Sequence, residues 1–342
     1  MLPGCPMTNQ NDLLTKLRIV VADTFSDSPE VVEFQRLSGG ASQETWSFDA
    51  VGNGTVTPLI LRRAAGRRQG SSSGFGLDTE AALVQVAEKH SVPVPHVFRV
   101  LQTGDDMGMG FIMNRIEGET IARKILRDAE FDAVRPKLAR QCGEIAAKVH
   151  AIPVEALPAL PYLGAAEQLA QYRDMYDNYD YPHPVFEYAF RWLSERVPKD
   201  TDPRCVHGDF RNGNFIFTPD SGVVAALDWE LAHTGDPMED LGWMCVNSWR
   251  FGNIDQPVGG FGSYEQLFEG YESVSGTLVD RDRVKYWETF GSLKWGIMCM
   301  SMYFTFNTGM DRSIERAAIG RRSSEAEIDL MRLLTARTDP SP

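Results

Sequence analysis

The sequence predicts an α+β fold in which an antiparallel five-stranded sheet with a helix is followed by a mainly helical region. Short runs of apolar and β-branched residues, separated by turn residues, occupy residues 31–116. From residue 117 on, apolar residues recur instead at the spacing of helices that bury one face. We therefore expect two domains, residues 1–116 and residues 117–342, with a hinge at about residues 114–118.

The N-terminal domain is predicted from the order of its strands and turns. Its expected strands are residues 31–37, 45–48, 58–63, 96–103 and 109–116, and its expected helices are residues 11–25 and 79–90. The first three strands follow one another closely, which favours an antiparallel meander. Asp78 is expected to cap the second helix. Residues 65–76 are largely glycine, serine and arginine, a composition that favours a loop.

The C-terminal domain is predicted to consist of helices on both sides of one strand–loop–strand unit. The expected helices are residues 131–151, 165–179, 185–197, 237–250, 264–274, 280–307 and 312–336. In the first of these, Leu138, Cys142, Ile145 and Val149 lie on one apolar stripe. The strand–loop–strand unit begins at Cys205 and leads to a second apolar run that ends before Asp228.

Composition and charge exclude several classes of protein. The 342 residues are 43% hydrophobic and 24% charged, which is enough to build a folded core. A net charge of −13 makes nucleic acid and anionic membranes poor partners, because both would be repelled. The five cysteines are scattered and odd in number, so they indicate neither a disulfide framework nor a zinc site. With no signal peptide in the first eleven residues and no long apolar run, we expect a cytoplasmic protein.

Three polar side chains at the ends of the central strands carry the candidate chemistry. Asp209 follows the first strand, Asn214 comes five positions later, and Asp228 follows the next strand. Oxygen ligands suit Mg²⁺, and Asn214 and Asp228 could supply them. Asp209 could then accept the proton of an attacking hydroxyl, as phosphoryl transfer from ATP requires. Each residue by itself is an ordinary turn former, and only the combined run indicates this chemistry.

At these residues the sequence resembles the aminoglycoside phosphotransferase and choline kinase group, relatives of the protein kinases. The matching motifs are His207-Gly208-Asp209, Asn214 and Asp228-Trp229-Glu230, with the continuation Gly235-Asp236-Pro237 and Asp240-Leu241-Gly242. The resemblance implies a bilobal protein-kinase-like fold. It also implies that Asp209 is the catalytic base, that Asn214 and Asp228 hold Mg²⁺, and that ATP is the donor, with GTP not excluded.

Four further residues of these motifs are interpreted as structural rather than as additional metal ligands. His207 belongs to the catalytic loop, and Glu230 follows the metal-binding Asp228. Asp236 is expected to cap the next helix, and Asp240 is expected to accept hydrogen bonds from the catalytic loop.

The N-terminal domain supplies the residues that the resemblance assigns to the nucleotide. The hairpin tip that would cover the phosphates is Ser38, Gly39, Gly40, Ala41 and Ser42, although it is not the G-x-G-x-x-G pattern. Arg62 stands where the family has a phosphate-binding lysine, and either Arg62 or Arg63 could face the phosphates. Glu80 would pair with Arg62. The hinge residues that would hold adenine are Met113, Asn114 and Ile116.

The function predicted is transfer of the γ-phosphoryl group of ATP to a hydroxyl of a small molecule. The aromatic and apolar character of the C-terminal helices favours an acceptor other than an aminoglycoside, because aminoglycosides need carboxylates. An aminoglycoside or choline-type kinase is the alternative within the class. A catalytically silent, nucleotide-binding scaffold is the alternative outside it, since Arg62 replaces a lysine and the glycine loop is short. Some kinase domains fused to acyl-CoA dehydrogenases resemble this chain in the leucine-arginine strand ending. The acceptor and the oligomeric state are left open.

Overall fold

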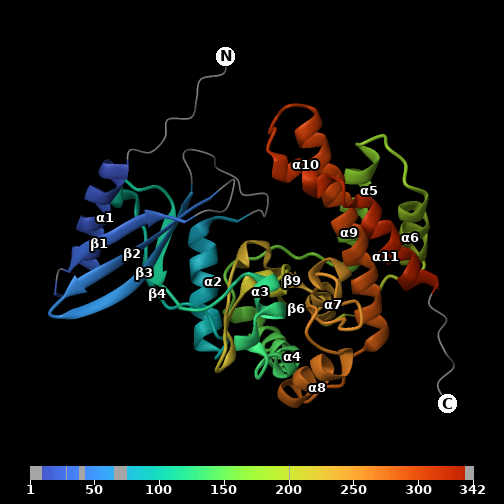
Figure 1. Cartoon of the computed structure of the whole chain (residues 1–342), viewed down its shortest axis with the longest axis horizontal. Coiled ribbons are helices and arrows are strands. Elements are labelled where there is room, and N and C mark those ends of the chain that lie inside the picture. The colour runs from blue at the N-terminus through green and yellow to red at the C-terminus, as the bar shows by residue number, and fades with distance from the viewer. Residues whose placement is uncertain (1–9, 28, 38–42, 65–74, 200, 336–342) are drawn as a thin grey trace. The chain divides into compact units, whose positions relative to one another are not determined.

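The protein was analysed as a computed structural model, which describes residues 10–27, 29–37, 43–64, 75–199 and 201–335. Its contacts divide the chain into two compact units (Figure 1). The first, called here the sheet unit, runs up to Gly118 and also includes Ala156–Leu160 and Ala225–Leu231. The remainder forms the second, called here the helical unit. The segment that carries Asp228 therefore belongs with the sheet, although it follows the catalytic loop in sequence.

The sheet unit contains the five-stranded antiparallel sheet that the sequence predicted. Its strands are β1 (Glu30–Arg36), β2 (Gln43–Gly52), β3 (Thr55–Ala64), β4 (Val97–Val100) and β5 (Gly110–Asn114), and its helices are α1 (Gln10–Thr24) and α2 (Leu77–Lys89). The strand order is β1-β2-β3-β5-β4, so β5 lies between β3 and β4. The α+β fold class and the inserted helix after the third strand are confirmed.

The β2–β3 hairpin is longer than predicted, because its turn takes only two residues. Asn53 and Gly54 both have positive φ angles, 48° and 76°, and Gly52 pairs directly with Thr55. An Asn-Gly pair favours this kind of tight turn, which matches the twist of the flanking strands. The register that follows places Arg62 opposite Thr45 and Phe111.

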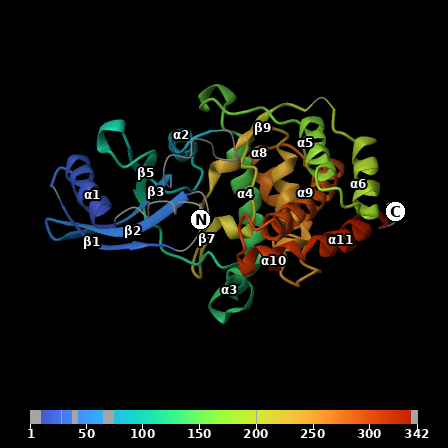
Figure 2. The same ribbon diagram turned by 90° about the horizontal axis from the view of Figure 1, so that it is seen from above.

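The two helices of the sheet unit cover opposite faces of the sheet (Figure 2). Leu13 and Leu17 of α1 pack in one core cluster with Leu59 and Leu61 of β3. Because side chains alternate along a strand, Arg62 points to the other face, where α2 lies. Helix α2 starts at Leu77 with Gly76 as its N-cap, so Asp78 lies in the first turn and is not the cap.

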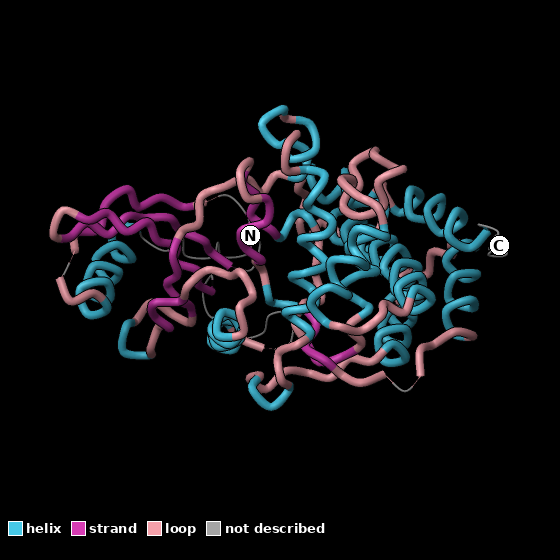
Figure 3. The backbone as a smooth tube through the Cα atoms, turned by 90° about the horizontal axis from the view of Figure 1, so that it is seen from below, coloured by secondary structure: helices cyan, strands magenta, loops and turns pink. Residues whose placement is uncertain are grey.

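The helical unit is built from nine helices in the described residues, together with short strands (Figure 3). The helices are α3 (Ala122–Arg127), α4 (Leu138–His150), α5 (Ala165–Asp177), α6 (Pro184–Ser194), α7 (Met238–Cys245), α8 (Tyr264–Ser275), α9 (Arg281–Asn307), α10 (Ile314–Gly320) and α11 (Ser323–Thr335). Two-stranded sheets are formed by β6 (Arg204–Val206) with β9 (His233–Gly235), and by β7 (Phe215–Thr218) with β8 (Gly222–Ala226). Helix α9 packs against α5, α6, α7, α10 and α11.

Several predicted helices are shorter in the structure. Short 3₁₀ turns precede α4, because Pro136 cannot donate the backbone hydrogen bond that a continuous α-helix needs there. The single helix predicted over 312–336 is divided into α10 and α11, and α7 gives way to a 3₁₀ turn at Asn247–Trp249. Helix α3 and strand β9 were not predicted.

Close helix packing explains one glycine of the helical unit. Helix α4 runs along α8, and a Cβ atom on Gly143 would lie 2.0 Å from the carbonyl oxygen of Leu267. Only glycine allows the two backbones to approach this closely. Within the described ranges, none of the helices is both long enough and apolar enough to cross a bilayer.

Candidate active site

The catalytic loop lies in the helical unit, between β6 and β7, and it holds the carboxylate of Asp209 in a fixed position. The Oδ1 atom accepts hydrogen bonds from Trp243 Nε1 at 2.7 Å and from Arg211 Nε at 3.0 Å. The Oδ2 atom accepts one from the side-chain amide of Asn214 at 2.6 Å. The predicted neighbours Asp209 and Asn214 are therefore in direct contact.

The charge state of Asp209 follows from these contacts. Burial raises the pKa of Asp209, but the Arg211 charge and the hydrogen bonds from Trp243 and Asn214 lower it more, so that the pKa lies below its usual value. At neutral pH the side chain is consequently an ionised carboxylate, and its hydrogen bonds fix its orientation.

Asp240 of α7 anchors the backbone of the catalytic loop, as the sequence predicted. Its carboxylate is fully buried and accepts hydrogen bonds from the backbone N–H of His207 at 2.8 Å and of Gly208 at 3.0 Å. It also contacts His150 Nε2 at 3.0 Å. A φ of +79° at Gly208 turns the chain there, which glycine permits without strain.

Asp236 has a structural environment as well. It accepts a hydrogen bond from the backbone N–H of Met238 at 3.0 Å, at the start of α7. It also pairs with Arg283 and accepts the indole N–H of Trp287 at 2.9 Å. Asp236 therefore joins the start of α7 to α9, although the N-cap of α7 is Pro237 and not Asp236 as predicted.

Sequence reasoning missed three residues of this loop environment. Arg211 and Trp243 both hold Asp209, and the buried Asn212 donates to the carbonyl oxygens of Trp249 and Gly259, each at 2.8 Å. Arg211 and Asn212 lie inside the motif and could have been considered. No sequence signal marks Trp243, because it contacts the loop only through the tertiary fold.

The sheet unit brings together a second group of polar residues around Arg62. Its Nη2 atom lies 2.6 Å from Asp228 Oδ1 and 3.4 Å from Glu80 Oε1, so the expected Arg62–Glu80 pair is present. Its Nε donates to Gln43 Oε1 at 2.6 Å, and Gln43 Nε2 donates to Glu230 at 3.0 Å. Arg62 thus links β3 to α2 and to the segment that carries Asp228.

The neighbouring arginine lies on the other face of the sheet. Arg63 Nε is 3.7 Å from Glu44 Oε2, and Arg63 belongs to the face that α1 covers. Of the two arginines, Arg62 is therefore the one that shares a face with Glu80 and Asp228.

Glu80 is buried at 2% exposure among several charges. Burial raises its pKa most, and Asp228 and Glu230 raise it further, whereas Arg62 lowers it; the pKa lies at about 7. Glu80 therefore gains or loses its proton near neutral pH.

Asn214 in the helical unit and Asp228 in the sheet unit each carry a side-chain oxygen of the kind that binds Mg²⁺. Asn214 donates through its amide nitrogen, which leaves its carbonyl oxygen as a ligand atom. Asp228 has a φ of +63°, a strained conformation for a non-glycine residue that is typical of functional sites, and its side chain is 36% exposed. Within the described residues, no cluster of three His, Cys, Asp or Glu side chains is placed to hold a metal. Mg²⁺ bound through one or two side chains and phosphates needs no such cluster.

The remaining predicted nucleotide residues lie on or near β5, apart from the hairpin tip. Met113 pairs with Ile60 of β3, and Asn114 Oδ1 accepts the backbone N–H of His96 at 2.6 Å. Ile116 follows the strand and is half-buried. The hairpin tip, Ser38 to Ser42, lies outside the described residues, as does most of the loop predicted over 65–76.

Comparisons with known proteins identify the family of this chain. The sequence matches the model of the Phosphotransferase enzyme family, APH, over residues 33–276. Acyl-CoA dehydrogenase family member 10 of Mus musculus is 25% identical over 253 residues, which are 70% of this chain and 22% of that protein. The chain spans between about a fifth and a third of the length of the curated relatives it matches.

Solved structures show the same fold. A putative aminoglycoside phosphotransferase from Ralstonia eutropha has a TM-score of 0.76 at 18% identity, over 95% of this chain and 99% of that one. Spectinomycin phosphotransferase in complex with ADP and spectinomycin has a TM-score of 0.64 at 11% identity, over 95% of this chain and 99% of that one. The predicted family resemblance and the kinase-like fold are thereby confirmed. The chain belongs to the phosphotransferase enzyme family.

Proposed function

We propose that the protein transfers the γ-phosphoryl group of ATP, with Mg²⁺, to a hydroxyl group of a small molecule other than an aminoglycoside. The observation that supports this most is the carboxylate of Asp209, which Arg211, Trp243 and Asn214 hold ionised and oriented. Family membership supports phosphoryl transfer in general, and the ADP in spectinomycin phosphotransferase supports a nucleotide as donor.

In this proposal the acceptor oxygen attacks the γ-phosphorus, the bond between that phosphorus and the β–γ bridging oxygen breaks, and ADP leaves. Asp209 takes the proton of the acceptor hydroxyl. Mg²⁺, held by Asn214 and Asp228, would neutralise charge on the phosphate oxygens.

The sheet unit would supply the nucleotide contacts. Arg62 is a planar cation that can bridge two phosphate oxygens, and its pair with Glu80 directs it. We assign the hairpin tip, Ser38 to Ser42, to the phosphates, and Met113, Asn114 and Ile116 to adenine. His207, Glu230, Asp236 and Asp240 are structural in this assignment. GTP remains an alternative donor, and the scattered cysteines support a cytoplasmic location.

Neutralised carboxylates in the helical unit argue against an aminoglycoside. Glu288, the buried carboxylate of α9, pairs with Arg250 at 2.8 Å and accepts the hydroxyl of Tyr264 at 2.8 Å. Glu239 accepts from Gln168 at 2.6 Å and contacts His233 at 3.2 Å. Carboxylates that are already paired in this way cannot easily meet the several ammonium groups of an aminoglycoside.

The test is the substitution Asp209→Asn in the full chain, followed by product formation with ATP, Mg²⁺ and a library of small hydroxyl compounds. Loss of the base is expected to reduce the rate with a reactive acceptor by about 100- to 10,000-fold. Asp220→Asn, at an exposed turn between β7 and β8, is the matched control and should retain the rate. Nucleotide binding without product from any acceptor, together with an unchanged background hydrolysis in Asp209→Asn, would instead support the scaffold alternative.

A further inference from the structure

Three tryptophans in edge-to-face contact form what is called here the tryptophan cluster: Trp243, which contacts Asp209, Trp249 and Trp295. Their ring centroids are 5.2 Å apart for Trp243 and Trp249, and 5.0 Å apart for Trp249 and Trp295. Trp243 donates its indole N–H to Asp209. The indole nitrogens of Trp249 and Trp295 are buried and have no hydrogen-bond partner in the described part of the chain.

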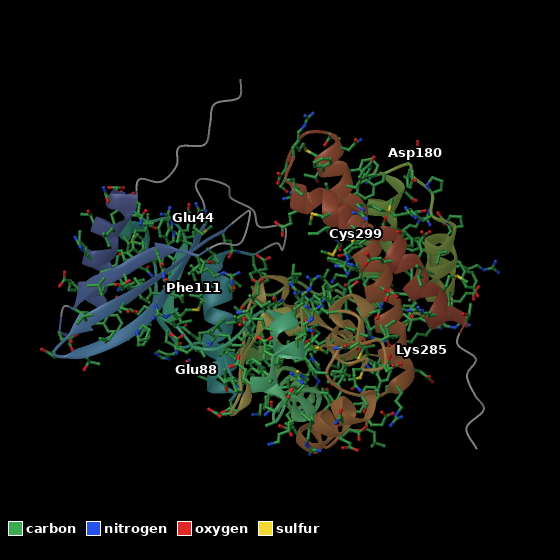
Figure 4. All side chains as sticks on the ribbon, viewed as in Figure 1. Glu44, Glu88, Phe111, Asp180, Lys285 and Cys299 are labelled. Atoms are coloured by element: carbon green, nitrogen blue, oxygen red, sulfur yellow. The ribbon has the colours of Figure 1, made fainter. Side chains whose placement is uncertain are left out.

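Lys294 of α9 adds a cation to this cluster. Its Nζ atom lies 4.8 Å from the ring centroid of Trp243 and 5.9 Å from that of Tyr172. The residue is only 8% exposed, yet among residues that the structure describes Lys294 has neither a salt bridge nor a side-chain hydrogen bond. Lys285 and Cys299 lie on the same helix, before and after Lys294 (Figure 4).

The ammonium group stays charged in this environment. Burial lowers the pKa of Lys294, whereas Tyr172, Glu239 and Asp209 raise it, and the pKa lies above its ordinary value. A buried ammonium is costly unless it is paired with an anion, and ring faces compensate only part of this cost. Among the residues that the structure describes, no anion forms an ion pair with this charge.

In the described residues, no carboxylate lies within ion-pair distance of Lys294, and the nearby carboxylates are hydrogen-bonded to other groups. Asp209 accepts hydrogen bonds from Arg211, Trp243 and Asn214. Glu239 contacts Gln168 and His233. In the described part of the chain, the buried donors of Lys294, Trp249 and Trp295 thus have no acceptor, and ring contacts link all three residues to Trp243, which contacts Asp209.

We propose that Lys294 and the tryptophan cluster recognise an anionic group on the acceptor, so that the acceptor is a small anion with a hydroxyl group. A carboxylate or phosphate oxygen would pair with the Lys294 ammonium, which lies over the ring of Trp243. The indole rings offer apolar surface to the carbon chain between the anion and the hydroxyl. This inference rests on the proposed function, because it names the substrate class of the same site.

The first test compares acceptors of one length and different charge: hydroxyhexanoate, hydroxyhexyl phosphate, hydroxyhexanamide and aminohexanol, each with a terminal hydroxyl. With ATP and Mg²⁺, the two anions should exceed the neutral amide in kcat/KM by about ten- to hundredfold, the range expected for a hydrogen-bonded charge pair. The better of the two anions identifies a carboxylate or a phosphate. Equal or better use of the amide or of aminohexanol overturns the proposal.

The second test examines Lys294 itself. Lys294→Met should remove the preference for the anion, chiefly through KM, and Lys294→Arg should restore most of it. Lys285→Met, on the same helix, is the matched control and should keep the preference. A preference that persists in Lys294→Met would refute the assignment.

A binding measurement separates this inference from the proposed function. Hexanoate has no hydroxyl to phosphorylate, so it reports anion binding without transfer and without nucleotide. It should change the fluorescence of the tryptophan cluster in the unmodified protein more than hexanamide does, and this change should disappear in Lys294→Met. If no compound is phosphorylated while this pattern holds, the proposed function fails and the anion site stands. If transfer occurs while hexanoate and hexanamide act alike, the anion site alone fails.

Discussion

Replacing Glu80 with glutamine should make the protein less sensitive to rising pH. Glu80 has a pKa raised from 4.5 to about 7 in the folded protein, chiefly by burial and despite Arg62. Below about pH 4.5, both the folded and the unfolded chain carry the proton. As the pH rises from 4.5 to 7, the unfolded chain loses the proton first, so Glu80 lowers the free energy of unfolding across this window.

The expected loss of stability follows from the size of this pKa change. At about 1.4 kcal/mol per tenfold change in proton affinity, the folded protein loses about 3 kcal/mol by pH 8. Glutamine resembles the protonated side chain and carries no charge at any pH. The difference in free energy of unfolding between Glu80→Gln and the unmodified protein should therefore shift in favour of the variant by about 2 to 3 kcal/mol between pH 5 and pH 8.

Urea unfolding followed by circular dichroism at several pH values measures this difference directly. Asp78→Asn, exposed on the first turn of the same helix, is the control and should differ from the unmodified protein by a constant amount. A difference between Glu80→Gln and the unmodified protein that does not change with pH would refute the reasoning about the buried charge.

Two further changes test the catalytic loop and the helix packing. Trp243→Phe removes the hydrogen bond to Asp209, so the pKa of Asp209 should rise. The acidic limb of the pH–rate profile should then move to higher pH by at least about one pH unit. An unmoved limb would contradict the assigned contact. Gly143→Ala places a methyl group against the backbone of α8 and should lower the free energy of unfolding by about 3 kcal/mol or more; Gly104→Ala, where nothing lies within 4 Å of the added atom, is the control in the same urea titration.

The sequence predicted best what depends on short stretches of chain. Asp209 and Asn214 are five positions apart on one loop, so their contact could be anticipated from spacing and chemistry. The antiparallel sheet followed from alternation and turn residues. Arg62 and Glu80 could be paired only through the family resemblance, since they are 18 positions apart on different elements.

The parts that could not be predicted depend on long-range packing or on competing local signals. Trp243 of α7 contacts Asp209, and Lys294 of α9 lies over the ring of Trp243; nothing in their own sequence neighbourhoods marks them. Pro136 interrupts a stretch whose apolar spacing still looks helical, which explains why the start of α4 was placed too early. The Asn53-Gly54 signal was present, but the strand pattern around it was interpreted as a longer turn.

The bridge that Arg62 makes has a consequence for how the proposed reactants would load. One guanidinium nitrogen contacts Asp228 and Glu80 together, so the arginine is an internal counter-ion for both carboxylates. If Asp228 holds the cation, the metal and the guanidinium would share one carboxylate group. Nucleotide phosphates would end this sharing by attracting the guanidinium. The nucleotide and Mg²⁺ would then bind together, with Arg62 exchanging Asp228 for the phosphates, and the affinity for Mg²⁺ would depend on the nucleotide.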